Sequence, residues 1–278
     1  MRMTNDKIKC FEEKLINEEK SDATLEKYLR DVKAFLNWTG DVEIDKVCVL
    51  KYKKYLMSTY APVSVNSVLS SLNSFFDFEG RQDLKVRMLR IQKQIFANKD
   101  RELSKTEYER LLRTAKKEKN QRLCYIMQTI CATGIRVSEL KFITVEAIKT
   151  GKAEISCKGK MRVVILPRQL CKILIGYTKR NNIKNGSVFV TRTGKAIDRC
   201  AVWKMMKGIC QKAGVAANKV FPHNLRHLFA RTYYKMQKDI VRLADILGHS
   251  SVNTTRIYTM ETGEIHRNHI QKLGLLMC

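Results

Sequence analysis

The sequence lacks the features that mark secreted and membrane-spanning proteins. Its nine cysteines form no C-x-x-C pair, and their odd number does not indicate a disulfide framework. No window approaches 18 apolar residues, and the first residues are polar, without the apolar stretch of a signal peptide. We therefore expect a soluble, cytoplasmic protein with reduced thiols and no membrane span.

Negative charge is also scarce. The chain has 27 Asp and Glu against 53 Lys and Arg, a formal net charge of +26. The excess is uneven, with about +3 in residues 1–100 and about +23 in residues 101–278. A charge this large exceeds what solubility requires and indicates a polyanionic partner. A basic ribosomal or histone-like protein would carry a similar charge, so the function must be inferred from motifs.

The apolar pattern of residues 4–80 predicts four helices, because apolar side chains recur there at helical spacing. Gly40 ends the second helix, and Gly80 ends the bundle. Residues 81–102 are mixed and basic, unlike ordinary linkers rich in Gly, Ser and Pro. We interpret them as a basic connector that lies against a phosphate backbone. Its candidate contacts to such a backbone are Arg87, Arg90 and Lys93.

The remaining residues, 103–278, predict a second domain that is mostly helical. Ser104 and Glu107 form a capping box at the start of its first helix. Two β-like runs, 153–157 and 162–166, are joined by a basic turn and predict a hairpin. The predicted fold is therefore mainly α, with an N-terminal four-helix domain, a basic linker and a mostly helical domain containing a small antiparallel β-sheet.

A polar constellation begins in this second domain at residue 221. Pro222 suits the first turn of a helix, because its missing N–H costs nothing there. His223 and Arg226 lie three residues apart and share one face of that helix. A cation and a hydrogen-bond donor on the first turn of a helix form a natural anion site. We therefore expect this segment to bind phosphate.

Two further polar groups follow along the chain. Gly248 ends the next helical run, and His249 comes directly after it. Tyr258 lies nine residues later in a short polar helix, whose register we expect Val252 and Ile257 to determine. Polar groups on three short helices can act together only if the fold makes them converge.

Taken in order, these motifs resemble one family over the whole chain. They are TGIRVSEL at residues 133–140, KGK at 158–160, HNLRH at 223–227, LGHS at 247–250, and Tyr258. Together they resemble the tyrosine recombinases, the phage-integrase family, and the compact Xer-like members are the most similar in layout. The resemblance identifies the first domain, 1–80, as a core-binding domain and the second as catalytic.

The resemblance implies cleavage of one DNA strand by attack of the Tyr258 phenol on phosphorus, giving a 3′-phosphotyrosyl link and a free 5′-hydroxyl. It also implies that no metal or other cofactor takes part. Arg136 and Arg226 match the two arginines that bind the non-bridging phosphate oxygens. Their guanidinium forks suit a phosphate that gains charge in the transition state.

Other roles are implied in the same way. Lys158 matches the hairpin lysine that protonates the leaving 5′-oxygen, and Lys160 remains the alternative acid. His223 matches an acid–base position near the nucleophile. His249 matches a position that donates a hydrogen bond to the phosphate. Glu139 is expected to orient either Arg136 or a histidine.

The implied partner is double-stranded DNA, bound by a tetramer on two duplexes. Lys160 and Arg162 of the hairpin are further candidate DNA contacts. Residues 264–276 predict a terminal helix with an apolar stripe, which in the family docks on a neighbouring protomer; packing within its own domain is the alternative.

Three other interpretations remain open from the residues. One is a DNA-binding regulator that has lost its chemistry, and another is a relaxing enzyme similar to type IB topoisomerases. His223 and His227 are four residues apart and could form one face of a zinc site, but no third ligand is evident.

Overall fold

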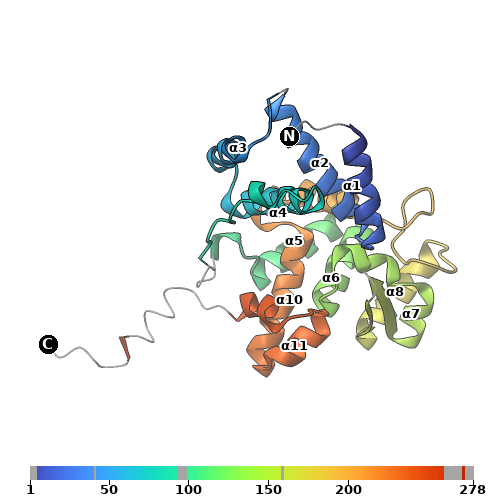
Figure 1. Ribbon diagram of the computed structural model, residues 1–278. Helices are drawn as coiled ribbons and strands as arrows, with labels where there is room; N and C mark the ends of the chain where they lie inside the picture. Colours follow the sequence, from blue (N-terminus) through green and yellow to red (C-terminus); the bar gives the residue numbers. More distant parts are fainter. Residues whose placement is uncertain (1–4, 41, 93–98, 158–159, 260–270, 273–278) are drawn as a thin grey trace. The chain divides into compact units, whose positions relative to one another are not determined.

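The computed structural model describes residues 5–40, 42–92, 99–157, 160–259 and 271–272. The chain divides into two compact units, Met1–Lys93 and Gln94–Cys278. Helices dominate both units, and the second also holds an antiparallel pair of strands, so the predicted fold class is confirmed (Figure 1).

The first unit contains the four predicted helices. They are α1 (Asn5–Asn17), α2 (Asp22–Thr39), α3 (Lys46–Thr59) and α4 (Pro62–Phe78). Pro62 occupies the first turn of α4, where its missing N–H is not needed. The apolar stripes meet in one core, in which Phe11, Phe35 and Phe75 are fully buried.

A buried carboxylate joins α2 to α4 in this unit. Lys27 Nζ donates to Asp31 Oδ2 at 2.7 Å and also to the Ser67 carbonyl at 2.9 Å. Ser71 Oγ donates to the same Asp31 oxygen at 2.8 Å. Because the buried Asp31 has both a counter-ion and a hydroxyl donor, its desolvation is compensated.

The packed part of the first unit extends beyond Gly80, into the residues that the sequence indicated as a basic connector. Leu84 and Val86 are buried in the first core. Asn73 exchanges two hydrogen bonds with the backbone of Val86, at 2.9 and 3.0 Å, and Asn66 binds the backbone of Leu89 in the same way. These asparagine contacts hold an irregular segment that has no helical period to reveal its packing.

The second unit is a helical domain that also contains the predicted hairpin. Its longer helices are α5 (Lys105–Lys117), α6 (Gln121–Thr133), α8 (Arg168–Arg180), α9 (Arg199–Ile209), α10 (Pro222–Gln237) and α11 (Ile240–Leu247). Shorter elements are η3 (Val137–Phe142), α7 (Val145–Thr150), α12 (Val252–Thr255) and η5 (Arg256–Tyr258). The strands β1 (Lys152–Cys157) and β2 (Lys160–Ile165) pair antiparallel. Both hydrogen bonds of the predicted capping box of Ser104 and Glu107 are present.

Close packing of α6 on α10 positions the polar constellation (Figure 1). Gly134 ends α6 with a φ of 68°, a conformation that residues with a Cβ rarely adopt. A Cβ added at Gly134 would overlap the ring of Phe229 on α10. Glycine at this position therefore allows the end of α6, and the Arg136 that follows it, to lie beside α10.

In the described part of the chain, no helix is both long and apolar enough to cross a membrane. Each cysteine whose side chain the structure describes is a free thiol.

Candidate active site

Arg226, on the second turn of α10, lies at the centre of the site and is fully buried. Its Nη1 donates to the carbonyl of Gly134 at 2.7 Å, and its Nη2 donates to the carbonyl of Leu247 at 2.7 Å. These carbonyls lie at the C-terminal ends of α6 and α11, which carry partial negative charge and favour a cation. The guanidinium thus joins the ends of two helices to the start of a third.

The charge of Arg226 is maintained despite its burial. Desolvation and, after it, the positive charge of Arg136 lower the pKa of Arg226 to about 10, while Tyr258 and Glu139 act in the opposite direction. A pKa of this size still leaves the guanidinium charged at neutral pH. Tyr258 therefore lies within the electrostatic reach of a buried cation.

Arg136 is oriented by Glu139. The backbone N–H of Arg136 donates to Glu139 Oε2 at 2.7 Å, and its Nη1 donates to Oε1 at 3.0 Å. The Glu139 side chain is 1% exposed, whereas the Arg136 side chain is 39% exposed. Of the two partners expected for Glu139, it is the arginine that it contacts. Arg136 is therefore held through its backbone N–H and its Nη1, while its side chain stays partly exposed to solvent.

Arg162 shares the same carboxylate. Its Nη2 donates to Glu139 Oε2 at 2.9 Å, and its Nη1 donates to the Leu247 carbonyl at 3.3 Å. The side chain crosses Gly248 so closely that an added Cβ there would lie 2.6 Å from Arg162 Cδ. The sequence indicated Arg162 as a DNA contact; in the structure its guanidinium binds Glu139 and the Leu247 carbonyl.

The parity of β2 explains this difference. Arg162 pairs with the buried Ile155, while its neighbours Met161 and Val163 are 75% and 58% exposed. Side chains alternate between the two faces of a strand, so the inward face of β2 carries Arg162 and Val164. The outward face of β2 thus carries the apolar Met161 and Val163, and the inward face carries an arginine beside the apolar Val164.

His249 has a defined ring proton. Its Nε2 lies 2.9 Å from Arg226 Nη2, and its Nδ1 lies 2.8 Å from Thr255 Oγ1. A guanidinium can only donate, so Nε2 accepts and the proton lies on Nδ1, which donates to Thr255. Desolvation, followed by the charges of Arg226 and Arg136, lowers the pKa of His249 to about 4. The ring is therefore neutral at neutral pH.

Tyr258 is 4% exposed and lies among histidine rings. Its ring is edge-to-face with His227 at a centroid distance of 4.9 Å, and it stacks on His249 at 6.1 Å. The side chains that face inward from α12 and η5 are Thr255 and Tyr258.

The register expected for this segment is therefore wrong. Val252 and Ile257 are each 41% exposed, although the sequence indicated that they determine the register. Both are apolar residues on the outer side of a short segment, and the polar inward pair is held by hydrogen bonding and ring contacts.

His227 is a site residue that the sequence indicated only as a zinc ligand. Its ring contacts both His223, at a centroid distance of 4.6 Å, and Tyr258. Its Nε2 is buried and has no hydrogen-bond partner among the described residues. Desolvation, then the charges of His223 and Arg231, lower the pKa of His227 to about 3. The spacing of four residues from His223 along α10 was the available signal, since it places both rings on one face.

His223, on the first turn of α10, is exposed, whereas His227 and His249 are half-buried. Partial desolvation, followed by the positive charges of Arg226 and Arg136, lowers its pKa. Within the described ranges, no three His, Cys, Asp or Glu side chains form a group that could hold a metal ion.

Several expected residues cannot be placed against this geometry. Lys158 lies outside the described residues, and so do Lys93 and the side chain of Lys160. All but two residues of the expected terminal helix, 264–276, also lie outside them. Arg87 and Arg90 are exposed on the first unit.

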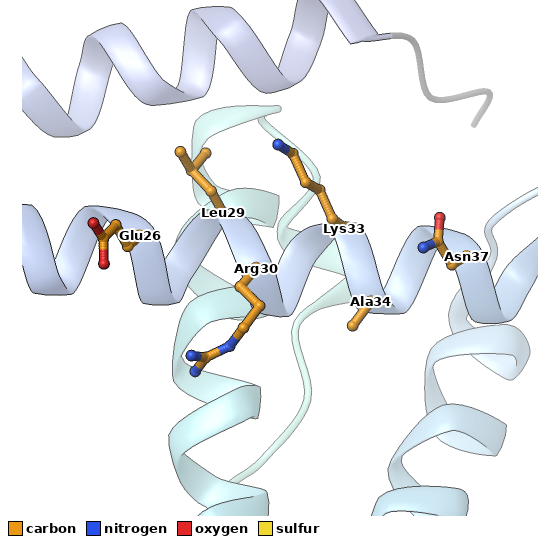
Figure 2. A pocket seen from close by; sticks show the side chains of 6 residues that line it. All are labelled: Glu26, Leu29, Arg30, Lys33, Ala34 and Asn37. Carbon is orange, nitrogen blue, oxygen red and sulfur yellow. The ribbon is translucent and has the colours of Figure 1, made fainter.

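A separate hollow lies along α2 of the first unit (Figure 2). It is lined by Glu26, Leu29, Arg30, Lys33, Ala34 and Asn37. Arg30 and Lys33 point to opposite sides of the helix, so they do not converge on a common point as the groups around Arg226 do. We therefore assign the candidate active site to the second unit.

Comparison with known proteins gives two family matches. The model described as "Phage integrase family" matches residues 101–264, and the model "Phage integrase, N-terminal SAM-like domain" matches residues 8–83. Tyrosine recombinase XerA of Thermococcus kodakarensis is 30% identical over 99% of this chain and 98% of its own length. Tyrosine recombinase XerD of Oceanobacillus iheyensis is 28% identical over 87% of this chain and 89% of its own length.

Solved structures agree in fold. A crystal structure of XerA recombinase is 26% identical, covers 99% of this chain and 100% of its own, and has a TM-score of 0.52. A lambda integrase(75–356) dimer bound to a COC′ core site has a TM-score of 0.76 over 94% of this chain and 97% of its own, at 17% identity. At that identity the likeness to lambda integrase is one of fold.

Proposed function

The chain belongs to the phage integrase family as a tyrosine-type site-specific DNA recombinase, and we propose that it works without metal, through a 3′-phosphotyrosyl intermediate on Tyr258. The observation that carries the proposal is the placement of the buried Tyr258 ring against His227 and His249, within the electrostatic reach of Arg226. The Tyr258 side chain thus has one buried cation, Arg226, within reach and two imidazole rings packed against its own ring.

In the proposed step, the Tyr258 oxygen loses its proton and bonds to the scissile phosphorus. The bond from phosphorus to the 5′-oxygen breaks, and that oxygen leaves with a proton as a 5′-hydroxyl. Attack by another 5′-hydroxyl on the phosphotyrosine reverses the step and rejoins a strand. Because each cleavage conserves a phosphoester bond, no external energy source is required.

The two arginines stabilise the phosphate as charge develops on it. Arg136 offers a partly exposed side chain, which Glu139 orients through the backbone N–H and Nη1. Three N–H groups of Arg226 donate to the Gly134 carbonyl, the Leu247 carbonyl and His249 Nε2. A guanidinium has about five N–H groups, so donors remain for a phosphate oxygen. Loss of one such donor typically costs about 10²–10³ in rate.

The proton transfers fall to lysine and histidine in this proposal. Lys158 protonates the leaving 5′-oxygen, with Lys160 as the alternative acid. His223, whose pKa is lowered by desolvation and by Arg226, is largely neutral at neutral pH and so accepts a proton near the nucleophile. His249 supports the phosphate by hydrogen bonding.

The proposed partner is duplex DNA, bound by a tetramer on two duplexes in the cytoplasm. The second part of the chain carries almost all of the excess positive charge, which suits a polyanion. One structure of similar fold is a lambda integrase tetramer bound to a Holliday junction. Residues 264–276 are the proposed segment exchanged between protomers, because their apolar stripe needs a surface to cover it.

Covalent capture tests this function. Incubation with genomic DNA, followed by sequencing of DNA attached to the protein, should map one cleavage position, and a nicked duplex carrying that position should then trap the adduct. We expect the adduct with the wild-type chain in the presence of EDTA and its loss in Tyr258→Phe. DNA binding without any adduct would favour a regulator. Relaxation of supercoils by a monomer would favour the topoisomerase-like alternative.

A further inference from the structure

A continuous hydrogen-bonded chain links the buried arginine to the segment that carries the nucleophile. Arg226 Nη2 donates to His249 Nε2 at 2.9 Å, and His249 Nδ1 lies 2.8 Å from Thr255 Oγ1. Thr255 is fully buried in α12, three residues before Tyr258. Its hydroxyl is therefore shielded from water.

The tautomer of His249 that this series of hydrogen bonds requires cannot donate a hydrogen bond to phosphate. With its proton on Nδ1, His249 presents an unprotonated Nε2 toward Arg226, and that nitrogen can only accept. The oxygens of a phosphodiester also only accept, so the two repel rather than bind. Protonation of the whole ring is unfavourable, because burial and three neighbouring arginines lower the pKa of His249 to about 4.

The other neutral tautomer solves this problem if Nδ1 then finds a donor. With the proton on Nε2, His249 can donate to a phosphate oxygen, and Nδ1 becomes an acceptor. A hydroxyl is both donor and acceptor, so Thr255 can accept from Nδ1–H in one state and donate to Nδ1 in the other by rotating its proton. In the exchange, Nδ1 releases one proton to water and Nε2 takes up one from water at the partly exposed ring, so the ring charge does not change.

We propose that Thr255 is a positioning residue whose hydroxyl lets His249 change from the acceptor tautomer to the donor tautomer when a phosphate engages Arg226. This inference rests on the proposed function, because it needs a phosphate in the site. The tautomer of His249 is then controlled by a residue of the same short segment that carries Tyr258. Entry of the phosphate and placement of the nucleophile are thereby linked through one hydroxyl.

Substitutions of similar shape test the hydroxyl itself. Thr255→Val removes it with little change of volume, and Thr255→Ser keeps it. Thr254→Val is the matched control, because Thr254 is the exposed neighbour on the same helix. In single-turnover cleavage of the nicked duplex, we expect Thr255→Val to be about 10- to 100-fold slower, the usual effect of removing a partner that orients an imidazole. Thr255→Ser and Thr254→Val should cleave within about threefold of wild type.

Two readouts separate this role from a merely structural one. DNA affinity and the thermal midpoint of Thr255→Val should remain close to those of wild type, so that the loss falls on the cleavage rate. Nitrogen-15 shifts of the His249 ring should show the proton on Nδ1 in the free protein, and on Nε2 when Tyr258→Phe binds the intact duplex. This measurement does not require Thr255→Val to fold.

The outcomes are distinct. If Thr255→Val cleaves at the wild-type rate, or if His249 keeps its Nδ1 proton on the bound duplex, the inference is overturned while a wild-type adduct on Tyr258 preserves the proposed function. If the wild-type chain forms no adduct on a mapped site, the proposed function fails, and the role of Thr255 fails with it.

Discussion

Arg162 donates from Nη2 to Oε2 of the buried Glu139 at 2.9 Å, and this pair ties the β-hairpin to the turn that carries Arg136. One buried carboxylate is therefore shared by an arginine of the hairpin and by an arginine that we propose binds the phosphate. We expect Glu139 to influence cleavage through these two arginines.

Glu139→Gln should destabilise the second unit and slow cleavage. Removal of one partner of a buried ion pair leaves an uncompensated charge and costs about 3–5 kcal/mol; we expect about 2–4 kcal/mol here, because Arg136 is partly exposed. The matched control is Glu118→Gln, which breaks the exposed pair with Lys212 and should cost less than about 1 kcal/mol. Urea unfolding measures both variants, and equal costs would show that Glu139 anchors nothing.

Gly248→Ala should harm the site beyond its backbone strain. A residue with a Cβ at a φ of 64° costs about 1–2 kcal/mol, and this Cβ would also displace Arg162. Gly186→Ala is the control, since Gly186 has a φ of 70° and open space around its Cβ position. We expect both variants to lose stability in thermal unfolding, and only Gly248→Ala to slow adduct formation by more than about tenfold. Equal cleavage rates for the two would contradict the contact with Arg162.

Stability should fall as the pH drops below the ordinary histidine value of about 6.5. Burial lowers the pKa of His227 to about 3 and that of His249 to about 4, so between these values and 6.5 the unfolded chain binds more protons than the folded one. The free energy of unfolding then decreases with falling pH, by up to about 1.4 kcal/mol per pH unit for each histidine. Above about pH 7 the effect vanishes.

His227→Phe tests this slope while keeping an aromatic ring beside Tyr258. Urea unfolding at pH 7, 6 and 5 should show that the free energy of unfolding depends less steeply on pH in this variant than in wild type. The difference is the contribution of one histidine. This window lies above the ordinary pKa range of carboxylates. An unchanged slope would mean that His227 already carries its proton in the folded state.

Arg87 and Arg90 should contribute to the salt dependence of DNA binding, and Arg162 should not. Each phosphate contact adds about 0.9 to the slope of log affinity against log salt concentration. The double variant Arg87→Ala, Arg90→Ala should therefore reduce the slope by roughly 1–2 units. Arg162→Ala should leave the slope unchanged, because its guanidinium is directed to Glu139. A slope reduced by Arg162→Ala alone would restore it as a DNA contact.

Local patterns were sufficient for the elements that depend on short sequence windows. The four helices of the first unit follow from apolar spacing, and α10 begins where Pro222 indicates. The capping box of Ser104 needs only four residues. Patterns failed where burial depended on another part of the chain: Arg162 faces inward, and Val252 and Ile257 face outward.

The sequence by itself determined the family, the types of side chain available for phosphate chemistry and several helix ends, because these depend on residues close together in the chain. The tertiary structure alone decided which partners those side chains have. Arg226 is buried because the carbonyl ends of α6 and α11 meet its guanidinium, and His227 reaches Tyr258 only through the packing of α10 beside η5. Such contacts join residues far apart in the chain, where no local period encodes which polar group will compensate a buried charge.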